Sequence, residues 1–176
     1  MRLSIHYETD ADLAMLRKMT IAVLGYGKQG RAHALNLRDS GCRVLVAQRP
    51  ESPRHSAAVA DGFNPIRIAE AALTADLLIF ALPGEAMSGV FAPQISPHLR
   101  PGQAQGFIHG FAIRFGQVVP PPNVNVIMVA PKGPGALVRS AYERGGGLAC
   151  LIAVHQDADG KALEKAKAWG AGIGGG

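Results

Sequence analysis

The stretch IAVLGYGKQGRAHALNLRDSG, residues 21–41, decides the fold. A short apolar run is followed by three spaced glycines, Gly25, Gly27 and Gly30, and then by a segment with helical periodicity. In a strand–turn–helix unit, these glycines permit the tight turn, the approach of a pyrophosphate to the backbone, and close packing of helix on strand. The free N–H groups and the positive dipole of the helix start also favour an anion. The alternative is an ordinary glycine-containing turn. The residues expected to contact a dinucleotide are Gly25, Tyr26, Gly27, Lys28, Gln29 and Gly30.

Apolar segments recur along the chain, and several are continuous runs, as in strands buried on both faces. The predicted strands are residues 20–25, 43–48, 75–83, 104–110, 124–131 and 148–155. The predicted helices are residues 28–40, stopped by Gly41, residues 68–74, and a last one that begins near Asp157 and runs through the stretch GKALEKAKAWGA. This alternation predicts an α/β fold of the Rossmann-like, doubly wound type, with a mostly parallel sheet and helices on both faces.

The composition excludes several classes of protein. With 176 residues, 48% hydrophobic and 18% charged, the chain is suited to one α/β domain and is not of the disordered class. The net charge of +5 is scattered and aromatics make up only 6%, so we expect small anionic ligands and no nucleic-acid partner. The longest apolar run, LACLIAV, is far too short to span a membrane, and the N-terminus has no leader pattern. We therefore expect a cytoplasmic protein without a membrane partner.

The end of the second predicted strand indicates which nucleotide is preferred. A site for NAD usually has Asp or Glu here to bind the ribose 2′-hydroxyl. This chain has Arg49, Ser52 and Arg54 in the stretch QRPESPR, a set that suits a 2′-phosphate because guanidinium groups bind phosphate through charge-assisted hydrogen bonds. Glu51 argues against this and could pair with either arginine. The alternative is a solvated basic loop. The sequence favours NADP over NAD.

Three further loops follow predicted strands, where such a fold binds its ligands. The stretch ALPGE, with Leu82 and Pro83, could form a wall of the cofactor site. His109 lies beside a glycine in HGFAIRFGQ, and Lys132 and Gly135 lie in the constrained turn APKGPG. A single histidine or loop lysine is usually structural or solvated. Because both occur at successive strand ends, we interpret His109 and Lys132 as candidate catalytic residues and Gly135 as a candidate cofactor contact.

These stretches resemble one family, the ketol-acid reductoisomerases, also called acetohydroxy acid isomeroreductases. GYGKQGRAHALNLRDSG is similar to that family's GYGSQGHAHALNLRDSG, and HGFAIRFGQVVPP is similar to its HGFNIHFGQIVPP. The similarity extends through VNVIMVAPKGPG and VRSAYERGGGLACLIAVHQDADG to the final GIGGG. The resemblance implies an enzyme of valine, leucine and isoleucine biosynthesis. It would catalyse a Mg²⁺-dependent alkyl migration in 2-acetolactate or 2-aceto-2-hydroxybutyrate, followed by reduction with NADPH to a 2,3-dihydroxy acid.

The resemblance also implies roles for single residues. The three glycines would bind the pyrophosphate, while Arg49 and Ser52 would bind the 2′-phosphate. His109 would be the active-site histidine, and Lys132 would lie beside the metal-bound substrate, where a cation stabilises oxyanion charge. Departures from the family pattern are Lys28, Arg31, Arg54, Ala112 and Ala136, which stand where the family usually has Ser, His, Ser, Asn and His. Lys28 and Arg31 could strengthen phosphate binding or could mark a divergent branch of the family.

The resemblance further implies that residues 1–176 are the N-terminal dinucleotide-binding domain, and that the family's helical metal- and substrate-binding domain is not in this chain. We expect no metal site here, because the only acidic residues spaced i, i+4 are Glu8 and Asp12. The chain alone would bind NADPH without turnover, and would self-associate or dock to the absent helical domain. Two alternatives stay open: a β-hydroxy acid type dehydrogenase, and a non-catalytic NADPH-binding module.

Overall fold

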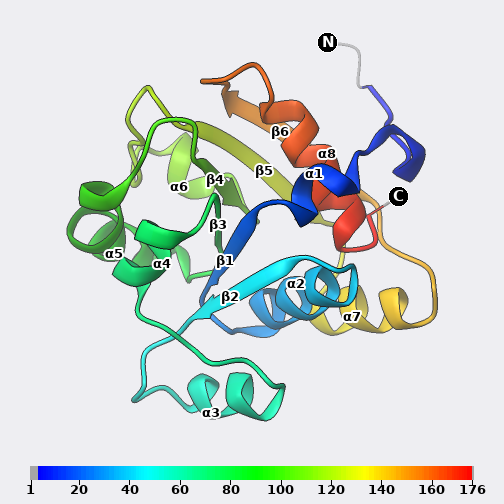
Figure 1. Cartoon of the computed structure of the whole chain (residues 1–176), viewed down its shortest axis with the longest axis horizontal. Coiled ribbons are helices and arrows are strands. Elements are labelled where there is room, and N and C mark those ends of the chain that lie inside the picture. The colour runs from blue at the N-terminus through cyan, green and yellow to red at the C-terminus, as the bar shows by residue number, and fades with distance from the viewer. Residues whose placement is uncertain (1–3, 176) are drawn as a thin grey trace.

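The computed structural model describes residues 4–175, which fold around one six-stranded sheet of order β2-β1-β3-β4-β5-β6 (Figure 1). Strands β1 to β5 are parallel, and β6 is antiparallel to β5. The strands are β1 (Thr20–Leu24), β2 (Arg43–Ala47), β3 (Leu77–Phe80), β4 (Ala104–Phe107), β5 (Asn125–Pro131) and β6 (Cys150–Gln156). All six lie where strands were predicted.

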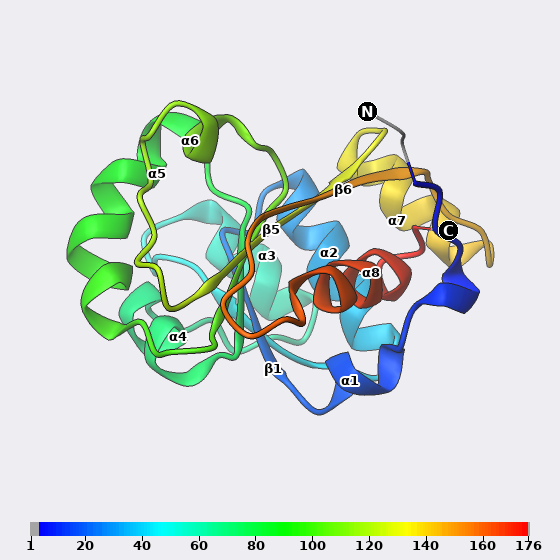
Figure 2. The ribbon, with the colours of Figure 1, turned by 90° about the horizontal axis from the view of Figure 1, so that it is seen from above.

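Helices cover both faces of the sheet, which confirms the doubly wound α/β class (Figure 2). One face carries α1 (Leu13–Arg17), α2 (Lys28–Asp39), α7 (Gly135–Glu143) and α8 (Ala162–Gly172). The other face carries α4 (Ile68–Thr74), α5 (Gly84–Val90), the π-helical turn η2 (Phe91–Ile95) and α6 (Phe111–Arg114). The remaining elements are α3 (Pro53–Ala60), η1 (Glu8–Asp10) and η3 (Ser96–His98). Among residues 4–175, no helix is long and apolar enough to cross a membrane.

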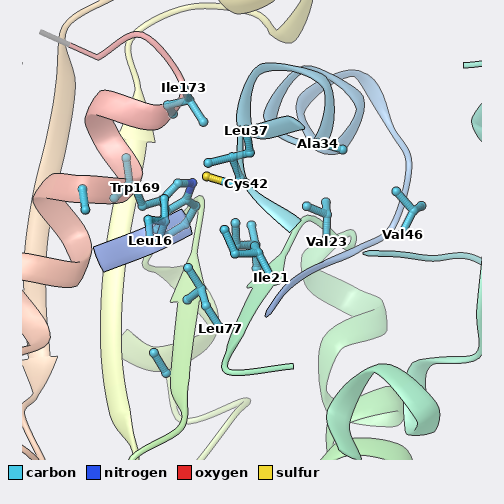
Figure 3. Packing of buried hydrophobic residues seen from close by; sticks show 14 of the residues in the cluster. Leu16, Ile21, Val23, Ala34, Leu37, Cys42, Val46, Leu77, Trp169 and Ile173 are labelled. Atoms are coloured by element: carbon cyan, nitrogen blue, oxygen red, sulfur yellow. The ribbon is translucent and has the colours of Figure 1, made fainter. Parts of the chain in front are cut away.

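The core on the α2/α8 face is built around the single tryptophan, Trp169, which is fully buried (Figure 3). Its ring lies against β4 at Gly106, where an added Cβ would come within 2.5 Å of a ring carbon. The indole N–H donates a 3.1 Å hydrogen bond to Nδ1 of the buried His33 in α2. On the opposite face, the rings of Phe80 and Phe107 stack with centroids 4.5 Å apart. The first cluster packs α2 against the sheet, and the second packs around the last residues of β3 and β4.

The predicted elements were confirmed most closely near the glycines. Helix α2 begins at Lys28 and ends at Asp39, and Gly41 has a φ of +85°, so it stops the helix as expected. Helix α4 has the predicted bounds. The predicted strand 75–83 was too long, because β3 ends at Phe80 and Pro83 already caps α5.

The start predicted for the last helix, near Asp157, was wrong. Helix α8 begins at Ala162, after a turn in which Gly160 has a φ of +74°. The two carboxylates precede the helix: Asp157 accepts from the N–H of Ala162 at 3.2 Å, and Asp159 accepts from the N–H of Lys161 at 3.0 Å. Both stabilise the helix start, as carboxylates do, but from outside the helix.

Candidate cofactor site at the ends of the parallel strands

The turn after β1 has the geometry that its glycines predict. Gly25 has a φ of +94°, and an added Cβ would lie 2.9 Å from the carbonyl oxygen of Ala81. Its N–H donates a 2.9 Å hydrogen bond to the carbonyl of Ala47 at the end of β2. At Gly30 an added Cβ would overlap the carbonyl of Gly25. Side chains are therefore excluded both at the turn and where α2 packs on it.

The start of α2 offers backbone donors to a ligand. The N–H of Tyr26 is already used, because it donates a 2.9 Å hydrogen bond to Oε1 of Gln48. The N–H groups of Gly27, Lys28 and Gln29 have no acceptor among the described residues. They lie at the positive end of a helix of 12 residues, which favours a negative group. These three N–H groups fit the pyrophosphate of a dinucleotide.

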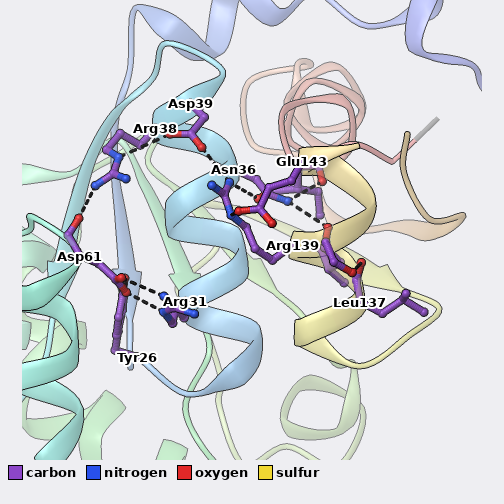
Figure 4. A network of polar contacts seen from close by, with 12 residues as sticks. Tyr26, Arg31, Asn36, Arg38, Asp39, Asp61, Leu137, Arg139 and Glu143 are labelled. Atoms are coloured by element: carbon purple, nitrogen blue, oxygen red, sulfur yellow. Dashed lines mark hydrogen bonds and ion pairs between the residues drawn. The ribbon is translucent and has the colours of Figure 1, made fainter. Parts of the chain in front are cut away.

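The side chain of Tyr26 is buried beneath the glycine turn and is held by Asp61 and Phe63. It is only 3% exposed, its hydroxyl donates a 2.8 Å hydrogen bond to Asp61, and its ring packs edge-on against Phe63 (Figure 4). Burial, with the hydrogen bond to Asp61, raises the pKa of the Tyr26 hydroxyl well above its ordinary value. Any contact of Tyr26 with a ligand at this loop would therefore come from its backbone.

Arg31 is held by the same carboxylate. Its Nε and Nη2 donate to the two oxygens of Asp61 at 2.6 and 2.8 Å (Figure 4). These hydrogen bonds lower the pKa of Asp61 below its ordinary value. Arg38 adds a 2.6 Å hydrogen bond to the carbonyl of Asp61. Arg31 thus forms an ion pair between α2 and the residue that ends α3.

Six of the predicted cofactor residues line one pocket of about 600 Å³ beside the glycine turn. They are Gly25, Arg49, Ser52, Arg54, Leu82 and Pro83. The sequence prediction missed other lining residues, among them Arg67 at the start of α4 and Gln94 in η2. No local motif marks these two residues, because the fold brings them to the pocket from later segments of the chain.

The polar groups of this pocket suit a phosphate. Ser52 caps α3 by accepting from the N–H of Arg54 at 3.3 Å, which leaves its hydroxyl proton available to donate. One guanidinium nitrogen of Arg54 lies 3.6 Å from the position of a Cβ on Gly27, so this side chain reaches over the glycine turn. In the described part of the chain, Glu51 forms no ion pair with Arg49 or Arg54.

A second pocket, of about 380 Å³, contains His109 and shares Leu82 with the first. His109 follows the end of β4, and its Nδ1 accepts a 3.2 Å hydrogen bond from the N–H of Phe111. This bond assigns the proton of a neutral ring to Nε2. Ala112 forms part of the wall, where the family has an asparagine, and Glu85 is the acidic residue that lines the pocket.

Of the two remaining predicted residues, Lys132 lies on the loop after β5 and Gly135 is the first residue of α7. Lys132 is exposed and is not among the residues that line the His109 pocket, although β4 and β5 are neighbouring strands. Gly135 is buried against the start of α2, where an added Cβ would lie 2.7 Å from the N atom of Gln29. Gly135 therefore packs directly on the start of α2, next to the N–H group of Gln29, and its contact with the cofactor stays a prediction. Ala136 is exposed.

Helix α7 is fixed to α2 by a polar cluster on Arg139 (Figure 4). Its guanidinium reaches Asn36 at 2.9 Å and Asp39 at 2.7 Å on α2, and Glu143 at 2.9 Å one turn further along α7. Because α7 begins directly after the loop that carries Lys132, this cluster helps to set the position of that loop.

Residues 4–175 do not fit a magnesium site. Among them, no three His, Cys, Asp or Glu side chains lie together so that they could hold a metal ion. A hard cation such as Mg²⁺ needs several oxygen ligands. The two pockets are instead lined by arginines, a histidine and apolar side chains, with one glutamate in each, Glu85 and Glu51.

Comparison with known proteins agrees with this geometry. The family model described as "Acetohydroxy acid isomeroreductase, NADPH-binding domain" matches residues 15–176. The chain is also similar to an NADH-preferring ketol-acid reductoisomerase from an uncultured archean, with a TM-score of 0.94 and 41% identity. That match covers 98% of this chain and 54% of the other, so this chain spans about half the length of that relative.

More distant structures share the fold alone. A semialdehyde dehydrogenase NAD-binding protein from Cupriavidus necator has a TM-score of 0.74 and 23% identity, over 89% of this chain and 59% of that one. A 3-hydroxyisobutyrate dehydrogenase from Mycobacterium tuberculosis has a TM-score of 0.67 and 21% identity, and the match covers 89% of this chain and 52% of that one. The family match over nearly the whole chain and the 41% identity decide the assignment. The chain belongs to the ketol-acid reductoisomerase (acetohydroxy acid isomeroreductase) family and matches its nicotinamide-cofactor-binding domain.

Proposed function

We propose that this chain binds NADPH in preference to NADH and supplies the cofactor-binding part of a ketol-acid reductoisomerase. The observation that carries the proposal is the single pocket in which Arg49, Ser52 and Arg54 stand beside the glycine turn. In this arrangement the free N–H groups at the start of α2 bind the pyrophosphate, and the two arginines with Ser52 bind the 2′-phosphate.

The second pocket would hold the reacting groups. Since Leu82 lines both pockets, a dinucleotide bound in the first lies next to the pocket of His109. When bound, NADPH supplies the hydride for reduction of a keto group. Nε2 of His109 can hold or donate a proton there, because its Nδ1 is fixed by the N–H of Phe111. The ammonium of Lys132 can stabilise negative charge that develops on a substrate oxygen.

The whole reaction is proposed from the family. Its substrate would be 2-acetolactate or 2-aceto-2-hydroxybutyrate, and its product a 2,3-dihydroxy acid of branched-chain amino acid biosynthesis. The Mg²⁺ that the resemblance implies finds no ligand set among residues 4–175. We therefore propose that residues 1–176 form a cofactor domain that does not turn over alone. A steady, acetolactate-dependent oxidation of NADPH by this chain in the presence of Mg²⁺ would contradict that.

Cofactor binding is tested by titrating NADPH into the purified chain and following the fluorescence of the reduced nicotinamide. We expect saturable binding of one NADPH per chain. Absence of binding at millimolar NADPH would refute the proposed function. The same samples test self-association, which stays a prediction, because light scattering distinguishes a monomer from larger species.

A non-catalytic NADPH-binding module is the second candidate. Ala112 in the wall of the His109 pocket, where the resemblance implies Asn, favours it. Such a module and a catalytic domain bind NADPH alike. They differ when a helical domain of the family is added to this chain with Mg²⁺ and 2-acetolactate: turnover supports the enzyme, and its absence supports the module.

A further inference from the structure

Arg67 is held beside the 2′-phosphate loop by backbone pairing. Ile66 forms an isolated parallel bridge with Ala47 at the end of β2. Its N–H donates to the carbonyl of Val46 at 3.0 Å, and its carbonyl accepts from the N–H of Gln48 at 3.2 Å. The residue after Ile66 therefore leaves this short ladder alongside the residues that follow Gln48. Arg67 stands there, at the start of α4.

Arg67 lines the same pocket as Arg49 and Arg54. It is exposed, and the described residues provide it with no carboxylate within ion-pair distance. Arg31, by contrast, forms a two-point ion pair with Asp61. Three arginines therefore line a pocket in which Glu51 is the acidic lining residue.

Part of the remaining lining of this pocket is apolar. Ile68, Leu82, Ala86 and Val90 provide a wall that suits a purine ring rather than a second anion. A ligand that combines a purine with a phosphate on its ribose matches both halves of this lining. The excess of cations over carboxylates matches a phosphate monoester, which carries close to two negative charges near neutral pH.

We propose that Arg67 is a third guanidinium of the 2′-phosphate site and determines, with Arg49 and Arg54, the preference for NADPH over NADH. This inference rests on the proposed function, because it assigns one more residue to the same cofactor site. Arg67 lies outside the loop in which the sequence predicts the phosphate contacts, so it provides discrimination that the QRPESPR stretch alone does not contain.

The test compares Arg67→Ala with the wild-type chain in titrations with NADPH, NADH, 2′,5′-ADP and 5′-AMP. The expected result is about tenfold weaker binding of NADPH and 2′,5′-ADP, the loss typical of one hydrogen bond to a charged group. NADH and 5′-AMP should change by less than about twofold, because they lack the 2′-phosphate. Arg67→Lys should recover part of the loss, because it keeps the charge without the planar fork.

Arg43→Ala is the matched control, because Arg43 is also exposed but lies at the opposite end of β2. It should leave all four affinities unchanged, and a loss there equal to that of Arg67→Ala would overturn the proposal. Equal weakening of NADPH and NADH by Arg67→Ala would also overturn it and would indicate stacking on the adenine. Unchanged NADPH binding by Arg67→Ala would refute the inference while leaving the proposed function intact. Failure of the wild-type chain to bind NADPH would refute both.

Discussion

The side-chain amide of Gln29 donates a 2.9 Å hydrogen bond to the carbonyl of Gly133. This bond joins the glycine turn that would bind the pyrophosphate to the loop that carries Lys132. Gly135 packs on the backbone of Lys28 and Gln29 directly beside it. The cofactor turn and the Lys132 loop are therefore one connected unit, even though they follow different strands.

Replacement of Gln29 by alanine should loosen this unit. We expect a loss of about 1 kcal/mol in the free energy of unfolding, the usual value for one hydrogen bond between neutral groups. Amide hydrogen exchange should become faster at residues 132–135, because the loop loses its bond to α2. Gln117→Ala is the control, since Gln117 is exposed. Unchanged exchange in the Lys132 loop would show that Gln29 does not hold it.

Replacement of Gly30 by alanine should damage the cofactor turn itself. The new Cβ would overlap the carbonyl of Gly25, so α2 must move away from the turn. We expect NADPH to bind at least about tenfold more weakly and the chain to lose about 1–3 kcal/mol of stability, as in overpacked cores. Both are measured by cofactor titration and urea unfolding.

Gly89→Ala provides the matched control for that substitution. Gly89 lies in α5, and an added Cβ meets nothing within 4 Å. It should leave NADPH binding unchanged and raise stability slightly, because alanine favours a helix more than glycine does. If Gly30→Ala behaves like Gly89→Ala, the close approach at the turn is not required.

The ion pair and hydrogen bonds of Asp61 with Arg31, Arg38 and Tyr26 should make the free energy of unfolding decrease at low pH. Hydrogen bonds from Arg31 lower the pKa of Asp61 in the folded chain below its ordinary value of 3.8. Its stabilisation is therefore complete above that value and is lost as the pH falls through the lowered pKa. Between pH 5 and pH 3, Asp61→Asn should lose less stability than the wild type. Glu70→Gln, at an exposed position, should follow the wild type, and identical curves for all three would refute the role of the cluster.

The buried His33 should make the stability of the fold depend on pH in a range above that of Asp61. Burial lowers its pKa from 6.5 to about 3, so the folded chain keeps the ring neutral while the unfolded chain protonates it. The resulting stability is present above pH 6.5 and is lost as the pH falls below it. From pH 7 to pH 5 the loss should be about 2 kcal/mol.

The measurement for His33 is urea unfolding at both pH values, for the wild type and His33→Asn. The variant should be less stable at pH 7, because it leaves a space beside Trp169, but it should lose less stability on acidification. His155→Asn changes an exposed histidine on β6 and should retain the wild-type loss. An equal loss in His33→Asn would contradict the account.

The elements and site residues that follow from local sequence patterns could be predicted. The strands, α2 with its stop at Gly41, and the positions of Gly25, Arg49 and Ser52 at one edge of the sheet all follow from apolar periodicity and turn residues. The start of α8 was missed, because two carboxylates that cap a helix from outside resemble a helix start.

Features that depend on distant contacts could not be predicted. Arg31 pairs with Asp61, 30 residues away, and the hydroxyl of Tyr26 donates to the same carboxylate. Gly135 packs on the first residues of α2 because α7 is held on α2, which no local pattern reveals. Arg67 reaches the pocket through a single bridge between Ile66 and Ala47.

The ratio of the dissociation constants for NADH and NADPH tests the central claim most directly. The relative from an uncultured archean is described as NADH-preferring, so the family alone does not decide this ratio. We predict that the wild-type chain binds NADPH at least about tenfold more tightly than NADH, because Arg49, Ser52 and Arg54 can bind a charged phosphate that NADH lacks. Equal affinities, or tighter binding of NADH, would contradict the assignment of these residues to the 2′-phosphate.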